Sequence, residues 1–221
     1  MILTTVASGL RRGAMHLTLS AALTALSAPV LLAQGQAGSR PVRLTAISGG
    51  LAHGSALVVD PAGQSDTRLD PGVTFGLELQ YGMFSFGSVY AGVAGSFSTL
   101  EHGANLGIVA GPGSSSATII LGTAGLVLEA SDWFANLRPT LRLGGGLKAY
   151  SFTASGASSS TAFTGDVGVG FRGGAGAIEV SGEVRYLPSV FDQAKLPLRG
   201  LAPQDQRQND LLFTIGVTVK P

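Results

Sequence analysis

The chain has no cysteine, few charged residues and, beyond its N-terminus, no long apolar run. Without cysteine it can form neither disulfide bonds nor thiolate metal sites. Charged residues make up only 12% of the 221 residues, and a formal net charge of +1 gives no support for nucleic-acid binding. No run of 18 or more apolar residues follows the N-terminus, so no later helix is expected to span a membrane.

Glycine, by contrast, is abundant at 33 residues, and Val, Thr, Phe and Ser are common while Glu and Lys are scarce. This composition favours β structure over helix. The length is sufficient for one sizeable domain. The mean hydropathy is positive, which is high for a soluble all-β domain but typical of a membrane β-barrel.

The N-terminus has the features of a secretory signal peptide. Arg11 and Arg12 precede a mostly apolar run over 15–33, which ends in a small residue, Ala33, before a polar stretch. A basic start, an apolar core and a small residue at the end are the three parts of such a signal. We therefore predict a cleavable signal peptide over residues 1–33.

Two other interpretations of this segment stay open. A retained membrane anchor would keep the whole run, and translation from Met15 would lose the basic pair. After cleavage, residues 34–41 form a short polar leader, and residues 42–221 form the folded domain.

The last stretch of the chain alternates with period two. One parity holds five large apolar residues, Leu211, Phe213, Ile215, Val217 and Val219. The other parity, after Leu212, is small or polar: Thr214, Gly216, Thr218 and Lys220. This pattern predicts a strand with one apolar face and one small, wet face.

Seven earlier segments also show strand character, and five of them alternate clearly. The clear ones begin near Val73, Val89, Leu137, Phe163 and Ile178. The segment over 42–51 has no clear face, because Arg43, Thr45 and Ile47 share one parity. The segment over 117–129 has mixed parity, and its predicted outward face is Ile120, Gly122, Ala124, Leu126 and Leu128.

The connections between these segments alternate between long and short. The longest is predicted over 187–209, and a further long one over 99–116. Each clear strand is predicted to run about ten residues, enough to cross a bilayer when tilted. An even number of such strands closes without an edge that would be exposed to lipid. The predicted fold class is therefore an all-β, eight-stranded antiparallel up-and-down transmembrane β-barrel.

The inward parity of the clear strands carries both signs of charge in nearly equal number. These residues are Glu78, Arg138, Arg142, Lys148, Asp166, Arg172, Glu179, Glu183 and Arg185, with Glu129 as a further acid. Unpaired buried charges cost several kcal/mol each, so we expect a paired network that plugs the lumen. The alternative is a gated narrow pore.

A more specific pairing follows from spacing. Arg138 and Arg142 lie four apart on one strand, as do Glu179 and Glu183 on another, and opposite walls of a narrow lumen can touch. Asp166 and Arg172 are expected to bridge the two strands.

Enzyme and cofactor sites find little support. The segment 168–173 has the G-x-G-x-x-G spacing, but it lies within a strand and no helix follows to hold a pyrophosphate. His53 and His102 are expected in long outer loops near serines, where a lipid-modifying enzyme would need them, but no spacing marks a triad. A metal site at these two histidines is a weaker idea still, and no cofactor is predicted.

In its strand pattern, the region 42–220 resembles the small eight-stranded outer-membrane β-barrels of the OmpA/OmpX type. The resemblance implies residence in the bacterial outer membrane, contact with its lipids, and a monomer. It also implies that Leu211, Phe213, Ile215, Val217 and Val219 form the C-terminal signal read by the barrel-insertion machinery, after transit with periplasmic chaperones. Such signals usually end in an aromatic residue, whereas this chain ends in Lys220-Pro221.

The expected function is non-enzymatic, with a structural or surface-interaction role through the outer loops. Three alternatives remain at this point: a narrow channel or transporter of small solutes, a lipid-modifying enzyme using a loop histidine, and a soluble lipocalin-like barrel. The last would place its apolar residues inside.

Overall fold

The strands of the folded domain account for most of the residues that the computed structural model describes. Those residues are 42–57, 69–86, 88–104, 115–130, 136–153, 156–175, 177–196 and 205–219. The predicted signal peptide and leader, residues 1–41, lie outside them.

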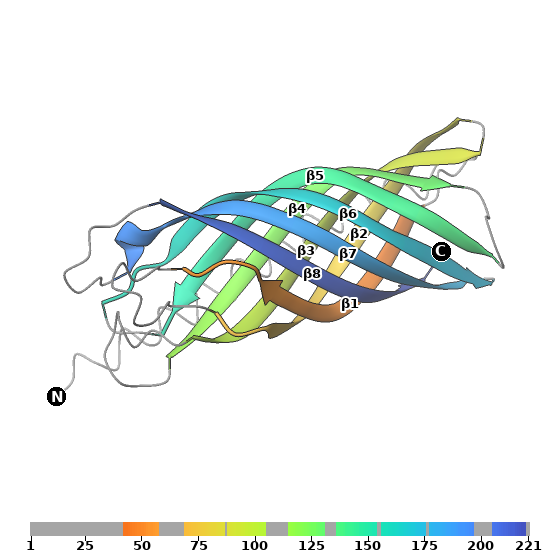
Figure 1. Ribbon diagram of the computed structural model, residues 1–221. Helices are drawn as coiled ribbons and strands as arrows, with labels where there is room; N and C mark the ends of the chain where they lie inside the picture. Colours follow the sequence, from red (N-terminus) through yellow and green to blue (C-terminus); the bar gives the residue numbers. More distant parts are fainter. Residues whose placement is uncertain are drawn as a thin grey trace, which may run out of the picture. The chain divides into compact units, whose positions relative to one another are not determined.

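Eight antiparallel strands follow one another around a closed barrel (Figure 1). They are β1 (Val42–His53), β2 (Gly72–Phe86), β3 (Val89–Ala104), β4 (Ser115–Ala130), β5 (Leu137–Phe152), β6 (Ser160–Ala175), β7 (Ile178–Asp192) and β8 (Asp205–Val219). The predicted all-β, eight-stranded antiparallel barrel is confirmed.

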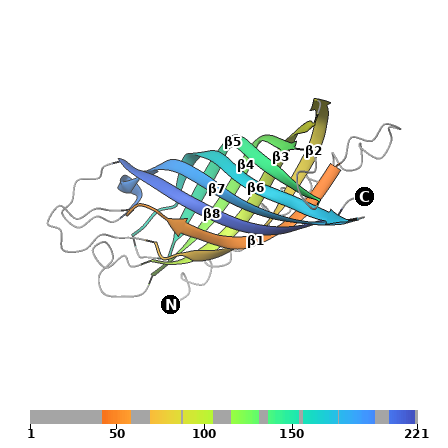
Figure 2. The same cartoon turned by 45° about the vertical axis from the view of Figure 1, so that its right-hand side comes forward.

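The barrel closes where the first strand pairs with the last. The register of β1 with β8 runs from Leu44 opposite Val219 to His53 opposite Asp210. Figure 2 shows these two strands side by side. Closure provides every strand with two hydrogen-bonding neighbours, which removes the sheet edge.

The alternation along each strand sorts side chains between the lumen and the outer wall. In β8 the apolar parity lies outward, and Thr214, Gly216 and Thr218 lie inward. In β1 the shared parity that left the face undecided is inward, since Arg43 and Thr45 are both buried. In β4 the predicted outward parity is exposed or half-exposed along its length.

The strands are longer than predicted, at 12 to 16 residues instead of about ten. The predicted connection over 187–209 is therefore wrong, because β7 continues to Asp192 and β8 begins at Asp205. Pro188 and the polar start of β8 hide the alternation there, but backbone pairing continues to Asp192 opposite Asp205. The connection predicted over 99–116 is shortened in the same way, since β3 runs to Ala104.

A short 3-10 helix, η1 (Gln193–Lys195), follows β7 at the end of the barrel where β1, β3, β5 and β7 finish (Figure 1). Oδ1 of Asp192 accepts a hydrogen bond from the backbone N–H of Ala194 at 2.9 Å and caps it. Among the residues described, no helix is long and apolar enough to cross a membrane.

Candidate functional site

The lumen is where the polar chemistry of the chain collects. All nine charged residues singled out from the sequence lie on the inward parity of their strands, and most of their side chains are buried. They fall into groups at different heights between the short-turn end and the long-loop end of the barrel.

Glu129 is the centre of the group nearest the short turns. Its carboxylate accepts hydrogen bonds from Arg43 at 2.5 Å and Arg138 at 2.6 Å, and Arg172 lies at 3.5 Å. These partners come from β1, β5 and β6, while Glu129 is on β4. Arg138 also pairs with Glu179 of β7, and Nε of Arg43 lies 3.8 Å from the Glu179 carboxylate.

A second acid shares one arginine, Arg172, with this group. Glu78 on β2 pairs with Arg142, and Arg172 lies 3.5 Å from it. Nε of Arg142 donates to Glu183 at 2.9 Å. Arg172 also donates to the side-chain oxygen of Gln80 at 2.5 Å.

We call these eight charged residues the lower network. Its members are Arg43, Arg138, Arg142, Arg172, Glu78, Glu129, Glu179 and Glu183. The four cations and four anions balance, and they tie together six of the eight strands. The attraction between paired charges offsets the desolvation penalty that each of them pays on burial.

Mid-barrel, Arg185 on β7 forms a separate fork. Its guanidinium donates to both carboxylate oxygens of Asp166 on β6, with the Nε contact at 2.9 Å. It also donates to Ser96 at 3.1 Å and to Thr123 at 2.5 Å, which lie on β3 and β4. One side chain therefore crosses the whole lumen.

This arrangement corrects the expected bridge. Asp166 and Arg172 do not link β5 to β7, because Asp166 is paired with Arg185 and Arg172 reaches β2 and β4. Arg138 and Arg142 of β5 contact the acids of β7 directly. The lumen is narrow enough that strands two apart touch without an intermediary.

Closer to the long loops, Lys148 forms a third group that sequence reasoning missed in part. Its ammonium donates to Asp210 at 2.7 Å, to the Leu187 carbonyl at 2.7 Å and to Ser189 at 3.1 Å. Nδ1 of His53 lies 2.9 Å from the other oxygen of Asp210. The inward parity of Asp210 on β8 was a signal that could have identified it.

The placement of the histidines in outer loops is also wrong. His53 is the last residue of β1, and His102 belongs to β3. The His53 and Asp210 side chains are 2% and 0% exposed, and Asp210 is shared with Lys148. His53 and Asp210 therefore form a buried structural contact. Within the described part of the chain, no group of three or more His, Asp or Glu residues is arranged to hold a metal ion.

The outer part of the lumen, nearest the long loops, is apolar. We call this part the apolar cluster; it consists of Leu51, Leu57, Leu69, Leu100, Ala117, Ile119, Leu121, Tyr150, Phe152, Ala162, Leu187, Phe191, Leu196 and Leu212. Phe191 packs edge-on against Tyr150 and Phe152, with ring centroids 5.1 and 6.0 Å away. Above the charged groups the lumen is therefore packed like the core of a soluble protein.

Comparison with known proteins identifies the fold. No protein-family model matches the chain, and no curated protein matches it. Among solved structures, Neisserial surface protein A (NspA) matches with a TM-score of 0.50 at 13% identity, over 81% of this chain and 95% of that one. OprG from Pseudomonas aeruginosa matches with a TM-score of 0.49 at 17% identity, over 82% and 97%. The outer membrane protease OmpT from Escherichia coli matches with a TM-score of 0.41 at 7% identity, over 82% and 97%. The likeness to NspA shows that this chain has the fold of the small outer-membrane β-barrels.

Proposed function

We propose that the chain is an outer-membrane β-barrel with a closed lumen and a non-enzymatic role, structural or in surface interaction through its outer loops. The observation that carries this proposal is the inversion of the usual burial pattern. Large apolar side chains cover the outer wall, while most of the charged side chains of the described strands lie inside.

Two pairs of residues give the scale of this inversion. Phe163 and Ile215 are 76% and 67% exposed, whereas Lys148 and Arg185 are each 1% exposed. A soluble lipocalin-like barrel would bury the first pair and expose the second. An apolar outer wall is stable where the surrounding medium is hydrocarbon.

The topology supports an orientation in that membrane. The connections after β1, β3, β5 and β7 are at one barrel end, and the shorter turns after β2, β4 and β6 are at the other. Outer-membrane barrels place their longer loops outside the cell and their short turns in the periplasm. The lower network would then lie near the periplasmic end and the apolar cluster near the surface.

The proposal includes a route by which the chain reaches the outer membrane. Residues 1–33 would direct export, periplasmic chaperones would carry the chain, and the insertion machinery would read the outward residues of β8. The mature protein would be a monomer in contact with outer-membrane lipids.

The export step predicts a defined N-terminus. Because cleavage is expected after Ala33, N-terminal sequencing of the membrane-extracted protein should begin at Gln34. A mature protein that still begins at Met1 or Met15 would show that no signal peptide is removed.

The closed lumen predicts electrical silence. The lower network and the apolar cluster leave little room for ions, so the unmodified protein should give no steady conductance in single-channel recordings from planar bilayers. Replacing Glu179 and Glu183 together by Gln should raise conductance, because water would enter to solvate the freed arginines of β1 and β5.

Insertion is checked on the same sample by protease protection of the strands, so that silence is not confused with failure to insert. Steady, large conductance from the unmodified, inserted protein would favour the narrow-channel function over the closed barrel.

A further inference from the structure

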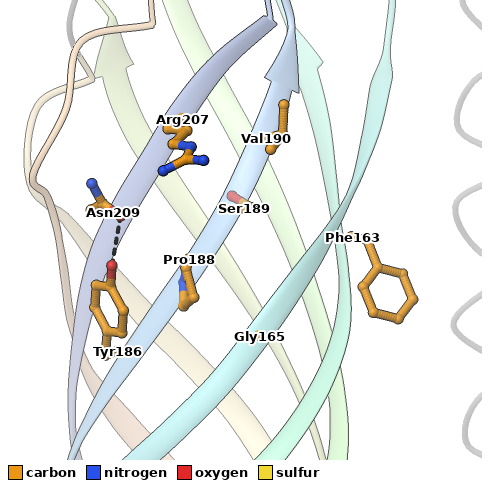
Figure 3. Close-up of a pocket in the computed structure, with 8 residues that line it drawn as sticks. All are labelled: Phe163, Gly165, Tyr186, Pro188, Ser189, Val190, Arg207 and Asn209. Carbon is orange, nitrogen blue, oxygen red and sulfur yellow. Dashed lines mark hydrogen bonds between the residues drawn. The ribbon is translucent and has the colours of Figure 1, made fainter.

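A groove of about 440 Å³ runs across the outer wall near the long-loop end, over β6, β7 and β8 (Figure 3). Its lining residues are Phe163, Gly165, Tyr186, Pro188, Ser189, Val190, Arg207 and Asn209.

The groove lies beside a row of bulky side chains, where two compact residues are neighbours on adjacent strands. Val190 pairs with Arg207, and Pro188 pairs with Asn209. The register of β6 with β7 places Phe163 beside Val190 and Gly165 beside Pro188. The glycine and the compact proline ring form a depression below the bulkier row.

The floor of the groove interrupts the sheet. Backbone pairing of β6 with β7 includes Thr164 opposite Ser189 and resumes at Val167 opposite Tyr186. Pro188 has no N–H to donate in between. The carbonyl of Pro188 accepts instead from Oγ1 of Thr164 at 3.0 Å, so this backbone group is satisfied within the fold.

One end of the groove is cationic. Arg207 is exposed, and among the strand side chains that the structure describes it is the only outward-facing basic one. Asp192 of β7 also faces outward, but its side chain caps η1 and lies 4.0 Å from Lys195. Beside Arg207, the hydroxyl of Tyr186 donates to Asn209 at 2.6 Å, as Figure 3 shows.

The outer wall of β8 changes from polar to apolar with distance from the long-loop end, as the surroundings of a lipid change from its head to its chain. Along the outward parity of β8, Arg207 and Asn209 are polar and the residues from Leu211 onward are apolar. A second groove, of about 400 Å³, is lined by Val184, Phe213 and Ile215 on the same wall. The seven residues from Arg207 to Phe213 span about 20 Å along the strand, which is roughly 14 Å of depth at a tilt of about 45° and close to the thickness of one leaflet.

We propose that this groove binds an anionic lipid, with the lipid phosphate at Arg207 and an acyl chain against Phe163, Pro188 and Val190. The proposal rests on the proposed function, because an acyl chain reaches this wall only if the wall faces a bilayer. The combination of a cation, a hydrogen-bonding amide and an apolar channel distinguishes this site from the rest of the outer wall that the structure describes.

The test uses the full mature chain in vesicles of equal parts phosphatidylglycerol and phosphatidylcholine. Lipids that remain bound after extraction are counted by native mass spectrometry. A single cation near an anionic lipid should give a preference for phosphatidylglycerol of roughly fivefold. Arg207→Gln should abolish the preference, and Arg207→Lys should keep most of it.

Lys195→Gln is the matched control, since it removes a cation at the same barrel end but outside the groove. It should leave the preference unchanged. Phe163→Ala should lower retention of both lipids without changing their ratio, because it removes one apolar wall.

Each other outcome overturns a specific step. A chain that does not insert into vesicles, judged by circular dichroism and protease protection, contradicts the proposed function. An inserted chain with equal retention of both lipids, or with the same preference after Arg207→Gln, contradicts the lipid site alone. Complete displacement of phosphatidylglycerol by added inorganic phosphate would show a free-anion site and would also overturn it.

Discussion

Replacing Glu129 with Gln is expected to lower the free energy of unfolding by about 3–5 kcal/mol, the usual cost of removing one partner of a buried ion pair. Gln keeps the size of the side chain but not its charge. Arg43, Arg138 and Arg172 would then lose their shared anion in a lumen where all three are largely desolvated. A urea titration in lipid vesicles, followed by circular dichroism, measures the loss.

Asp192→Asn is the matched control for this substitution. It makes the same acid-to-amide change, but in a half-exposed pair with Lys195 at 4.0 Å. Exposed pairs contribute about 1 kcal/mol or less. A loss for Glu129→Gln no larger than that of the control would mean that the lower network does not stabilise the barrel.

For most strands the inward and outward positions could be predicted, because apolar residues lie outward and small or polar residues lie inward. In β8, Phe213, Ile215 and Val217 alternate with small or polar residues, and the pattern has one consistent solution. The topology then follows from strand number and connection length. Closure of an even-numbered antiparallel sheet leaves no other arrangement without an edge.

The outer part of the lumen could not be predicted, because there both faces of a strand are apolar. In β4, Ile119 and Leu121 point into the apolar cluster while Ile120 and Gly122 point outward. Alternation of polarity is then absent, and the sequence cannot separate the sides. The same effect shortened β7 in the prediction, where Phe191 continues the inward row.

The partners of each charge were also beyond the sequence. The set of inward charges follows from parity, but Arg185 with Asp166 and Arg138 with Glu179 depend on register and on the width of the lumen. Arg43 was missed because Ile47 shares its parity. A lumen that is polar at one end and apolar at the other places both residue types on one face.

Placing a charge on the outer wall is expected to lower the free energy of unfolding nearly as much as removing a charge from the lumen does. Ile215 lies halfway along the outward apolar residues of β8, from Leu211 to Val219. Its lateral neighbours are Ser48 on β1 and Gly182 on β7, so an arginine there meets no steric obstacle from large side chains. Ile215→Arg should therefore cost about 2–4 kcal/mol through desolvation near the bilayer midplane.

Ser151→Arg is the control for position. Ser151 is exposed on β5, near the long-loop end, opposite Thr118 of β4. An arginine at this level can reach the lipid headgroups, where the cost falls to about 0–1 kcal/mol. The contrast between the two variants isolates depth in the membrane from the general effect of adding a cation.

The difference between these two unfolding free energies, measured by urea titration in the same vesicles, tests most directly whether the apolar wall faces lipid. A membrane-spanning barrel predicts that Ile215→Arg is the less stable variant by about 2–3 kcal/mol. Equal stabilities, or a stabilised Ile215→Arg, would place that wall in water and contradict the account.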